Sequence, residues 1–556
     1  MTIDVADEKY IDALRVYAGG QNELASNQPQ IKRARPFSRK NADAVPGSAA
    51  PSAARTEIIG TAYDTAWLAS VPSAHDQNEP RYPQCLSWLV DQQHADGSWG
   101  GSVRYEHDRV ISTLAALTSL ATYGRRTSDV ASIAAGTRYL WQHGHLIAHE
   151  PMELVGFELL LPAMVRRAQQ AGIAVPPNLN FYQNEREEKL RLIPAKALYS
   201  AKTTISHSLE FLGDDAQVER LRAVQSSNGA IGNSPATTAF YLALTNDVRA
   251  EAYLDSLLDL GSDAAPVLYP CETFELLWAA YPLSLVGVPA RRLLSPTQLT
   301  GLRKSLAHGG ISLSPTFPVA DADDTAVALI LLNELGHTVD PSILQAFASA
   351  NGYFVSFPLE RHSSVGVNLH VLHALLRVPG YPDRENVIDR LLDYFEAQQI
   401  GGSYWLDKWH ISPYYATAHA LRVFAELPPS RRERVEPLVA RAREWLRQTQ
   451  MSDGQWGFYA GPTAEETAYA VLALSAEGWE TSTPGDRQRC LAALRHLSAA
   501  LATDPTDEGQ LFPPLWIDKC LYAPSRIVRA TIEAACIACL NSWPMLSQSD
   551  AKESVA

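Results

Sequence analysis

Three acidic residues, Asp321, Asp323 and Asp324, form the cluster Asp-Ala-Asp-Asp directly before an apolar stretch that begins at Thr325. Carboxyl groups this close together cannot all ionise cheaply, so at least one of them keeps its proton above the ordinary pKa of aspartate. A carboxylic acid that is neutral at pH 7 can donate a proton. If it faces a hydrophobic cavity, it could protonate a group as weakly basic as a carbon–carbon double bond. The structural alternative is a helix N-cap, for which one aspartate suffices.

The residues around this cluster predict a chain built almost entirely of helices. Apolar residues recur with the 3.6-residue period of an α-helix in stretches such as 110–122, 236–244, 325–335 and 467–477, and strand-like alternation is scarce. Residues 21–55 are rich in Ser, Asn, Pro, Ala and basic residues, which is typical of a flexible segment. We therefore predict an all-α protein.

A repeated pattern predicts how these helices are arranged. A glycine-containing turn is followed, after roughly ten to fifteen residues, by a helix that opens with a pair of small residues. Instances are 96–100 before Ser112-Thr113, 228–229 before Thr237-Thr238, 309–310 before Thr325-Ala326, 401–403 before Thr417-Ala418, and 453–457 before Thr467-Ala468. Small residues let inner helices converge, and acids at their starts suit the positive end of the helix dipole.

Arranged around a ring, such helices form an α/α barrel. The spacings Gln93 to Trp99 and Gln450 to Trp456 would tie neighbouring repeats together through glutamine capping and tryptophan packing. A plain α-solenoid without a cavity is the alternative. Only one repeat carries the triple-carboxylate entrance, which indicates that this position is specialised.

Composition excludes several classes of function. The 556 residues are 46% hydrophobic and 19% charged, an ordinary globular composition with length for two or three domains. The formal net charge of -14 argues against nucleic-acid binding as the main function. No apolar run reaches membrane-spanning length, and residues 1–10 carry acids without an apolar signal core, so we expect a cytoplasmic protein with no stable membrane insertion.

The cysteines are expected to be buried core thiols. Six are scattered along the chain, and Cys536 and Cys539 form a CxxC in an alanine-rich helical stretch with no second pair. A redox or metal site at this pair is the alternative. A reducing cytosol fits this pattern best.

These motifs together resemble the class II diterpene cyclases, the copalyl diphosphate synthase-like enzymes that carry a DxDD motif. The resemblance extends in order over about residues 60–530. Its blocks are Tyr63-Asp64-Thr65-Ala66-Trp67, the HSLE block of 202–210, the NG…SPATTA segment of 228–239, Asp321-Ala322-Asp323-Asp324, the stretch 407–415, Glu465-Glu466-Thr467-Ala468-Tyr469, and 515–522.

The resemblance implies two α/α-barrel domains, called γ and β. A γ-like domain would cover 58–285 and a β-like domain with the DxDD motif 286–545, after an N-terminal segment of 1–57 with a helix near 5–20 and before a tail of 546–556. Class I terpene synthases ionise the diphosphate with DDxxD and a second metal motif, and we find neither in this sequence. Asp214-Asp215 does not continue the pattern. A bifunctional enzyme is therefore not expected.

The resemblance assigns Asp323 as the general acid, with Asp321 and Asp324 accepting hydrogen bonds and holding its carboxyl protonated. His370 lies where plant relatives commonly place an asparagine that supports the acid. We expect it to hydrogen-bond the same carboxyl and to help recharge it with a proton. Asn368 is the second candidate for this support, and a packing role is the alternative for His370.

His207 matches the histidine of the HSLE block. In plant ent-copalyl enzymes that histidine and an asparagine position the water that removes the final proton. Here Val267 stands in place of the asparagine. His207 is therefore a candidate base, with lining or packing of the pocket as the alternative.

The resemblance also implies a binding site for the diphosphate. Lysine supplies a point positive charge for this, and Lys202 and Lys519 are the main candidates, with Lys408 as a third. Glu185 and Glu188 resemble the family's acidic Mg²⁺ motif, because hard oxygen ligands suit Mg²⁺ bridging to phosphate. A solvated helix face is the alternative for these two glutamates.

Aromatic side chains are expected to stabilise the cations of cyclisation, because aromatic faces attract cations without reacting as nucleophiles. Barrel packing is the alternative for any one of them. The candidates in or near family blocks are Trp405, Tyr414, Tyr415 and Trp516, together with Trp67, Trp278, Trp409 and Tyr522.

The predicted function is protonation-initiated cyclisation of a linear prenyl diphosphate with the diphosphate retained. The leading substrate is geranylgeranyl diphosphate, giving a copalyl-type labdane bicycle, and farnesyl diphosphate, giving a drimenyl-type product, is the close alternative. The product is expected to pass to a class I terpene synthase or a phosphatase. A non-catalytic α/α barrel that binds prenyl groups is the rival of another class.

Overall fold

The computed structural model describes residues 58–180, 182–258, 263–360, 362–459, 461–477, 483–503 and 512–541. The predicted helix near 5–20, the rest of the segment 1–57 and the tail 546–556 lie outside the described residues. All the described residues belong to one compact unit.

The described part of the chain is almost entirely helical, as predicted. Its first helices are α2 (Ala62–Ala69), α3 (Pro83–Asp91), α4 (Glu106–Tyr123), α5 (Thr127–His143), η1 (Gly144–His149), α6 (Phe157–Gln170), η2 (Pro177–Asn180), α7 (Gln183–Leu192), α8 (Ala195–Leu198), η3 (Thr204–Asp215), α9 (Val218–Ala223), α10 (Pro235–Thr245) and α11 (Val248–Leu258). The following helices are α12 (Glu272–Leu285), α13 (Ala290–Leu293), α14 (Pro296–Ala307), α15 (Ala322–Glu334), η4 (Pro341–Phe347), α16 (Val365–Arg377), α17 (Arg384–Gln398), α18 (Pro413–Phe424), α19 (Pro429–Thr449), α20 (Ala464–Leu474), α21 (Pro484–Ala502) and α23 (Ser525–Asn541).

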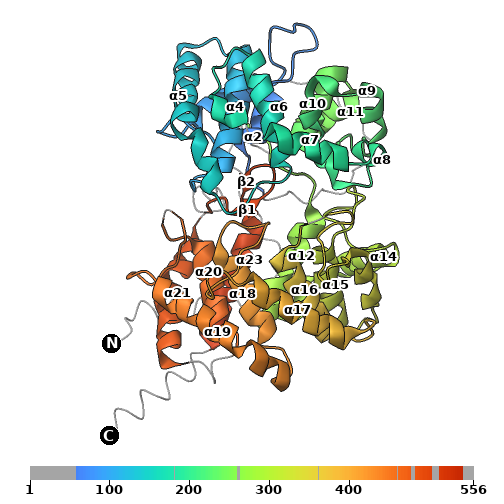
Figure 1. Ribbon diagram of the computed structural model, residues 1–556, viewed down its shortest axis with the longest axis vertical. Helices are drawn as coiled ribbons and strands as arrows, with labels where there is room; N and C mark the ends of the chain where they lie inside the picture. Colours follow the sequence, from blue (N-terminus) through green and yellow to red (C-terminus); the bar gives the residue numbers. More distant parts are fainter. Residues whose placement is uncertain are drawn as a thin grey trace, which may run out of the picture. The chain divides into compact units, whose positions relative to one another are not determined.

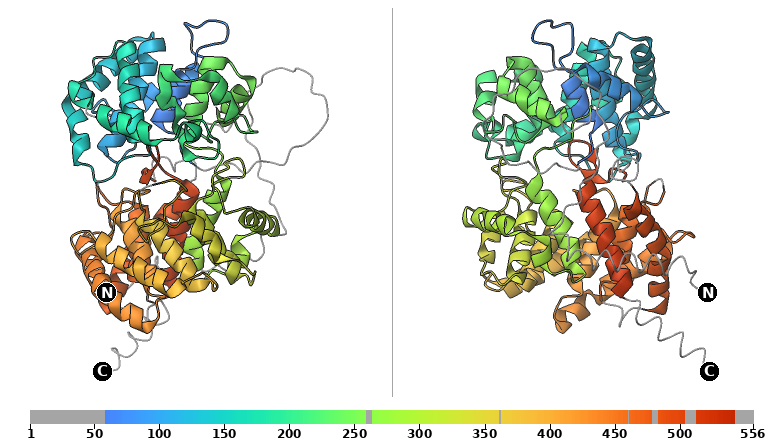
Figure 2. Two further views of the ribbon diagram at one scale, coloured as in Figure 1. Left: turned by 45° about the vertical axis from the view of Figure 1, so that its right-hand side comes forward. Right: turned by 180° about the vertical axis from the view of Figure 1, so that it is seen from behind.

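The inner helices close into two rings, so the fold is a pair of α/α barrels rather than an open solenoid (Figure 1). In the first ring α2 contacts α4, α4 contacts α6, α6 contacts η3, η3 contacts α10, and α10 returns to α2. In the second ring the order is α12, α15, α16, α18, α20 and α23, and α23 packs against α12 to close it (Figure 2). Outer helices such as α5, α11, α17, α19 and α21 each pack against an inner helix.

Helix α12 lies in the second ring, where it packs against α15 and α23. The predicted boundary between 285 and 286 assigned this helix to the first domain. Its packing differs because the helix buries Trp278 and Tyr281 beside His370 of α16. The remaining domain limits stay predictions.

A short hairpin near the end of the chain contacts both rings. Strands β1 (Trp516–Ile517) and β2 (Leu521–Tyr522) pair antiparallel, with Trp516 opposite Tyr522. The Ile517 amide donates to the Trp409 carbonyl in the second ring, and the Asp518 carbonyl accepts from the Val155 amide in the first. The hairpin therefore places residues 516–522 where side chains of the two rings meet.

The predicted ties between repeats are present. Gln93 Nε2 donates to the carbonyls of Gly97 and Ser132 at 2.8 and 3.0 Å, and Trp99 Nε1 donates to the Leu89 carbonyl at 2.6 Å. Gln450 makes the matching bonds to Gly454 and Arg489, and Trp456 bonds the Leu446 carbonyl. These bonds fasten each glycine turn to the outer helices beside it.

The small residues at the inner helix starts have a second role that size alone did not predict. One threonine in each pair accepts a hydrogen bond from a backbone N–H just after the preceding turn, which would otherwise be buried without a partner. The pairs are Trp99 to Thr113, Ile231 to Thr238, Ile311 to Thr325, Trp405 to Thr417, and Trp456 to Thr467, at 2.9–3.2 Å.

All six cysteines are buried, as expected for core thiols. Within the described ranges, no helix combines the length and the apolar character that a membrane crossing requires.

Candidate active site

A cavity of about 190 Å³ lies beside the acidic cluster. Its walls come from both rings and from the β1–β2 hairpin. The lining residues include Val155, Thr204, His207, Gly232 and Asn233 from the first part of the chain, Phe274, Trp278, Leu313, Phe317, Asp321, Asp323 and Asp324 around α12 and α15, and Phe357, Glu360, Trp409, Tyr415, Trp516, Asp518 and Tyr522. The site is mainly aromatic and apolar, with carboxyl groups at separate places on its wall.

The three aspartates have different places at the start of α15. Asp321 is the N-cap, and its Oδ1 accepts the Asp324 amide at 2.7 Å. Its own amide donates to the Ile311 carbonyl, and the Ala322 amide donates to the Ser356 carbonyl. Because these bonds fix the first turn, the Asp323 side chain is held at the cavity wall, where it is 15% exposed.

Asp323 contacts His370 of α16. Its Oδ1 lies 2.7 Å from His370 Nδ1. Burial raises the pKa of Asp323 well above its ordinary value, and the nearby Asp407 carboxyl raises it further against the opposing charge of Lys408. Asp407 is buried and accepts hydrogen bonds from Ser364 Oγ and the Gly366 and Trp409 amides. The pKa of Asp323 is therefore raised first by burial and second by the Asp407 carboxyl, rather than by Asp321 and Asp324.

His370 is neutral and makes a second hydrogen bond on the side of its ring away from Asp323. Burial, with the charge of His373, lowers the pKa of His370 to about 3. Its Nε2 lies 3.1 Å from Nδ1 of His419, whose pKa burial also lowers. Asp323, His370 and His419 thus form a row of hydrogen-bonded groups that leads from the cavity into the second ring.

The other two carboxyls of the cluster also border the cavity, and each has hydrogen-bond partners of its own. Trp278 Nε1 donates to Asp324 Oδ1 at 3.0 Å. Burial raises the pKa of both Asp321 and Asp324, and the charges of neighbouring carboxyls add to the shift. The cluster therefore carries fewer than three negative charges at pH 7.

Asn368 does not support the acid. Its Nδ2 donates to the carbonyls of Phe354 and Ser364 at 2.9 and 2.7 Å, and its Oδ1 accepts the Phe354 amide at 2.8 Å. These three bonds use its amide on the loop before α16. Residue 368 lies two positions before His370, so it points to a different side of the helix from the acid.

Two of the four main aromatic candidates line the cavity. Tyr415 and Trp516 have ring centroids 5.5 Å apart, and Trp278 lies 5.9 Å from Trp516. Trp405 and Tyr414 do not line it. Trp405 is the tie of its repeat, donating to the Phe395 carbonyl at 2.8 Å, and Tyr414 stacks on Trp445 at 4.7 Å, so both are packing residues.

His207 lines the cavity as half of an ion pair. Its Nε2 donates to Asp518 Oδ1 at 3.0 Å, and its Nδ1 donates to the Gly232 carbonyl at 2.8 Å. Burial alone would lower the pKa of His207, but the Asp518 carboxylate raises it above the ordinary value. Burial opposes ionisation of Asp518, and the His207 charge still lowers its pKa. Both ring nitrogens of His207 therefore have partners within the protein; Val267 is buried and does not line the cavity.

Lys519 cannot hold a diphosphate, contrary to its prediction. Its side chain is fully buried, and Nζ donates to Glu210 Oε1 at 2.9 Å, to Ser234 Oγ at 2.5 Å and to the His207 carbonyl at 3.1 Å. Asp64 Oδ1 lies 3.9 Å away. All three ammonium hydrogens have partners, so Lys519 neutralises buried carboxylates.

The other two lysines differ in position. Lys408 donates to Glu360 Oε1 and to the His362 carbonyl, and its charge acts on Asp323, so it lies at the acid end of the cavity. Lys202 is exposed, two residues before Thr204 of the cavity wall.

Glu185 and Glu188 are exposed on α7, one turn apart. They offer oxygen atoms of the kind that Mg²⁺ takes. Within the described ranges, no group of three or more His, Cys, Asp or Glu side chains is placed to hold a metal ion. These two carboxylates could hold Mg²⁺ only together with oxygens of another molecule.

Sequence reasoning missed Asp518, His419 and Asp407. Asp518 precedes Lys519 in a recognised block, and its place on the β1–β2 turn was the available signal. His419 lies in α18 one helical turn after Tyr415, so the two side chains share the face of the helix that is turned to the site. Asp407 is the first residue of the stretch 407–415, which resembles a block of the family.

Comparison with known proteins gives consistent matches over most of the chain. The family model described as the squalene-hopene cyclase C-terminal domain matches residues 357–500. The type B diterpene cyclase of Mycobacterium tuberculosis is 30% identical over 512 residues, which cover 86% of this chain and 95% of that protein. The terpentedienyl-diphosphate synthase of Kitasatospora griseola is 30% identical over 509 residues, covering 86% and 96%.

A solved structure shares the arrangement of the two rings. The ent-copalyl diphosphate synthase from Streptomyces platensis superposes with a TM-score of 0.70 at 27% identity, covering 86% of this chain and 95% of that one.

Proposed function

This chain belongs to the class II diterpene cyclase family, whose enzymes act on prenyl diphosphates, and we propose that its Asp323 protonates the terminal double bond of geranylgeranyl diphosphate. The observation that carries the proposal is the Asp323 carboxyl on the wall of an aromatic cavity, with its pKa raised by burial and its Oδ1 on Nδ1 of a neutral histidine. Two ring closures follow, and the bicyclic product keeps its diphosphate.

The hydrogen bonds around Asp323 set which oxygen delivers the proton. Neutral His370 has one ring N–H, and with Nδ1 as the donor to Oδ1 the acid proton stays on Oδ2, which makes no hydrogen bond to a described residue. After transfer, His370 passes its Nδ1 proton to the carboxylate while its Nε2 takes one from His419 Nδ1, and His419 takes one at Nε2 from water, so each histidine stays neutral. Both histidines act through neutral forms, as their lowered pKa values require.

The ring of Trp278, Tyr415 and Trp516 stabilises the carbocations. Each aromatic face contributes roughly 0.5–2 kcal/mol to a cation held over it, and none of the three is a nucleophile under these conditions. Their edge-to-face and tilted contacts keep the rings in fixed places. This order favours one folding of the substrate chain.

Asp518 is the group that ends the reaction. Its carboxylate takes a proton from carbon next to the cation, and the C–H electron pair becomes the new double bond. A carbon beside a carbocation is so acidic that a base of low pKa suffices. His207 holds Asp518 in place and keeps it ionised.

Lys202 is our candidate for the diphosphate, because it is the exposed lysine beside the cavity wall. Mg²⁺ held by Glu185 and Glu188 together with diphosphate oxygens would neutralise part of the head-group charge.

The test is turnover by the purified full-length chain. The protein is incubated with geranylgeranyl and with farnesyl diphosphate, with and without Mg²⁺, and the products are dephosphorylated and identified by gas chromatography and mass spectrometry. A labdane-type bicyclic alcohol from the C20 substrate supports the proposal. A bicycle from the C15 substrate alone replaces it by the drimenyl alternative, and tight binding without a bicyclic product from either leaves the rival prenyl-binding barrel.

A further inference from the structure

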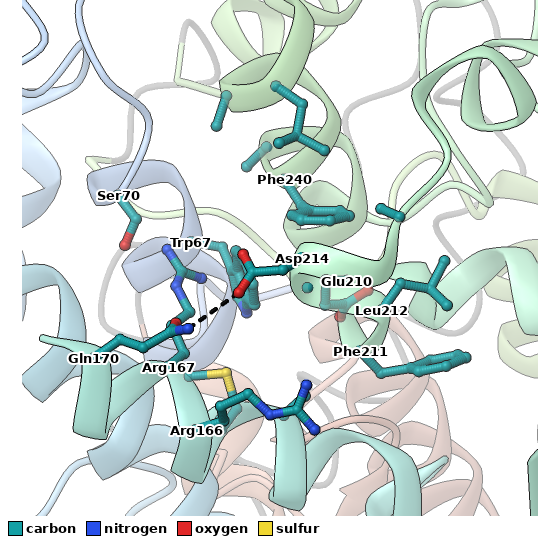
Figure 3. A pocket seen from close by; sticks show the side chains of 17 residues that line it. Trp67, Ser70, Arg166, Arg167, Gln170, Glu210, Phe211, Leu212, Asp214 and Phe240 are labelled. Carbon is teal, nitrogen blue, oxygen red and sulfur yellow. Dashed lines mark hydrogen bonds between the residues drawn. The ribbon is translucent and has the colours of Figure 1, made fainter.

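The first ring contains a second cavity, of about 380 Å³, with walls from α2, α6, η3 and α10. Figure 3 shows it from close by: Arg166, Arg167 and Gln170 extend from α6, and Phe240 comes from α10. Among the described residues, none lines both this cavity and the one at Asp323. The proposed cyclisation uses no part of it.

Arg167 is the main polar feature of this cavity. Its guanidinium covers the Trp67 ring, with Cζ 3.7 Å from the ring centroid. Stacking uses the face of the guanidinium, whereas its N–H bonds lie in the plane of the group and point past the ring. In the part of the chain that the structure describes, Arg167 forms no ion pair. Burial lowers its pKa to about 10, so it still carries a positive charge at pH 7.

Neither Glu210 nor Asp214, the two carboxyl groups that line this cavity, forms an ion pair with Arg167. Glu210, on the cavity floor, accepts from Lys519 at 2.9 Å, from Tyr63 Oη at 3.2 Å and from Thr237. Asp214, at the rim, accepts from Gln170 Nε2 at 3.0 Å (Figure 3). Arg167 is half-buried and, among the described residues, has no ion-pair partner of its own, so the cavity favours a ligand that brings a negative charge to it.

Two further features of the cavity indicate the chemical class of its ligand. Arg166 is the preceding residue of α6, 44% exposed and 3.8 Å from the exposed Asp215, so it adds a second positive charge that favours a head with more than one negative charge. The remaining wall is apolar and includes Ala163, Phe240, Ala243 and Leu244. A phosphate or diphosphate with a hydrocarbon chain matches both the arginine end and the apolar wall of the cavity, since guanidinium groups suit phosphate oxygens.

We propose that this cavity binds a second prenyl phosphate or diphosphate, with its head on Arg167 and its chain along α10. The prenyl identity of the chain rests on the proposed function. The anionic head does not, because it follows from the cavity alone.

The test counts binding sites with a probe that cannot be cyclised. Phytyl diphosphate has the C20 chain but lacks the terminal double bond, so it stays intact whether or not the chain is a cyclase. Equilibrium dialysis measures its stoichiometry on the full-length protein and on three variants. Arg167→Gln removes the charge, and Ala243→Phe fills the cavity while it leaves Arg167 in place. Arg220→Gln is the matched control, because Arg220 also lies over an aromatic ring, Tyr199, but is exposed and outside the cavity.

Two sites per chain are expected for the wild type and for Arg220→Gln. The second site is expected to weaken at least tenfold in Arg167→Gln and in Ala243→Phe, while turnover of geranylgeranyl diphosphate stays unchanged. One site in the wild type, or two unweakened sites in both cavity variants, overturns the proposal. Palmitate bound through Arg167 in place of phytyl diphosphate overturns it as well. Failure of turnover in every protein bears on the proposed function and leaves the count readable.

Discussion

Two buried carboxylate clusters occupy equivalent places in the two rings. Asp64 lies in the first turn of α2 and Asp324 in the first turn of α15, and each is followed by a threonine that accepts a backbone N–H, from Ala265 at 3.0 Å and from Ile311 at 2.9 Å. Burial raises the pKa of both aspartates. Local structure and burial are thus alike in the two places.

The difference lies in what balances the charge. In the first ring Lys519 lies between Glu210 and Asp64, all three fully buried. In the second ring the groups in hydrogen-bond contact are neutral, the imidazole of His370 and the indole of Trp278. In the second ring a bound proton must therefore neutralise carboxylate charge, as the Lys519 ammonium does in the first ring. Asp323 also lines its cavity, whereas Asp64 is fully buried and lines neither of the two cavities, so a raised pKa marks burial, whereas proton donation needs access as well.

Replacing the acid should have the largest effect. Asp323→Asn removes the transferable proton and keeps the side-chain size, so we expect kcat to fall by roughly 10²–10⁴-fold, the usual contribution of a general acid. Product formation from geranylgeranyl diphosphate measures it, and circular dichroism checks the fold. Asp64→Asn is the matched control and should retain turnover under conditions in which it is folded. Equal losses in the two variants would remove the distinction between the clusters.

The two lysines separate structure from binding. Lys519→Met leaves Glu210 without its cation, and we expect the free energy of unfolding to fall by about 3–5 kcal/mol, measured by urea denaturation. Adding Glu210→Gln should recover part of this loss. Lys202→Met should leave the free energy of unfolding unchanged and raise KM several-fold. A stable Lys519→Met protein with a raised KM would return Lys519 to the diphosphate.

These two lysines also show how far the sequence could lead. The helical period, the glycine turns and the aspartate cluster are local patterns, so the α/α barrels and the place of Asp323 could be predicted from them. The partner of Lys519 is Glu210, 309 positions away, and no local pattern tells a lysine at a cavity from one buried on a carboxylate. Trp405 and Tyr414 were assigned to the cavity for the same reason. Tyr414 lies in α18 beside Tyr415, and the rotation of that helix decides which of the two faces the cavity. Trp405 lies in the loop before α18, and its bond to the Phe395 carbonyl is a contact that no local pattern shows.

The pH dependence of stability should follow Asp64. Burial raises its pKa to about 7, even against the charge of Lys519. Between about pH 4 and pH 7 the folded protein holds a proton that the unfolded chain releases, so this group lowers the free energy of unfolding as pH rises. Asp64→Asn cannot titrate. The free energy of unfolding of the variant minus that of the wild type should therefore rise by roughly 2–4 kcal/mol across this window. Urea denaturation at four pH values measures the difference, and parallel curves would contradict the assigned pKa.

His370 should affect the rate but not substrate binding. His370→Ala removes the bond to Asp323 Oδ1 and the contact with His419, and we expect kcat to fall by roughly 10–100-fold with KM unchanged. His370→Asn keeps a side chain that can hydrogen-bond the acid and should recover part of the rate. Because His370 is neutral down to about pH 3, the wild-type rate between pH 5 and 7 should show no step from it. A step that disappears in His370→Asn would mean that an imidazolium takes part.

The smallest effect is expected at Trp278, where the second cluster has an indole in place of an ammonium. Trp278→Phe keeps an aromatic face on the cavity but removes the N–H that bonds Asp324 Oδ1. The loss of one hydrogen bond to a buried carboxyl costs about 1 kcal/mol, so we expect a decrease of less than tenfold in kcat and a small fall in the melting temperature. Since a neutral donor is lost, the product pattern should stay the same. A loss as large as that of Asp323→Asn would show that the acid depends on an ionised Asp324. The difference between a cluster balanced by a proton and one balanced by a cation would then concern Asp324 and not Asp323.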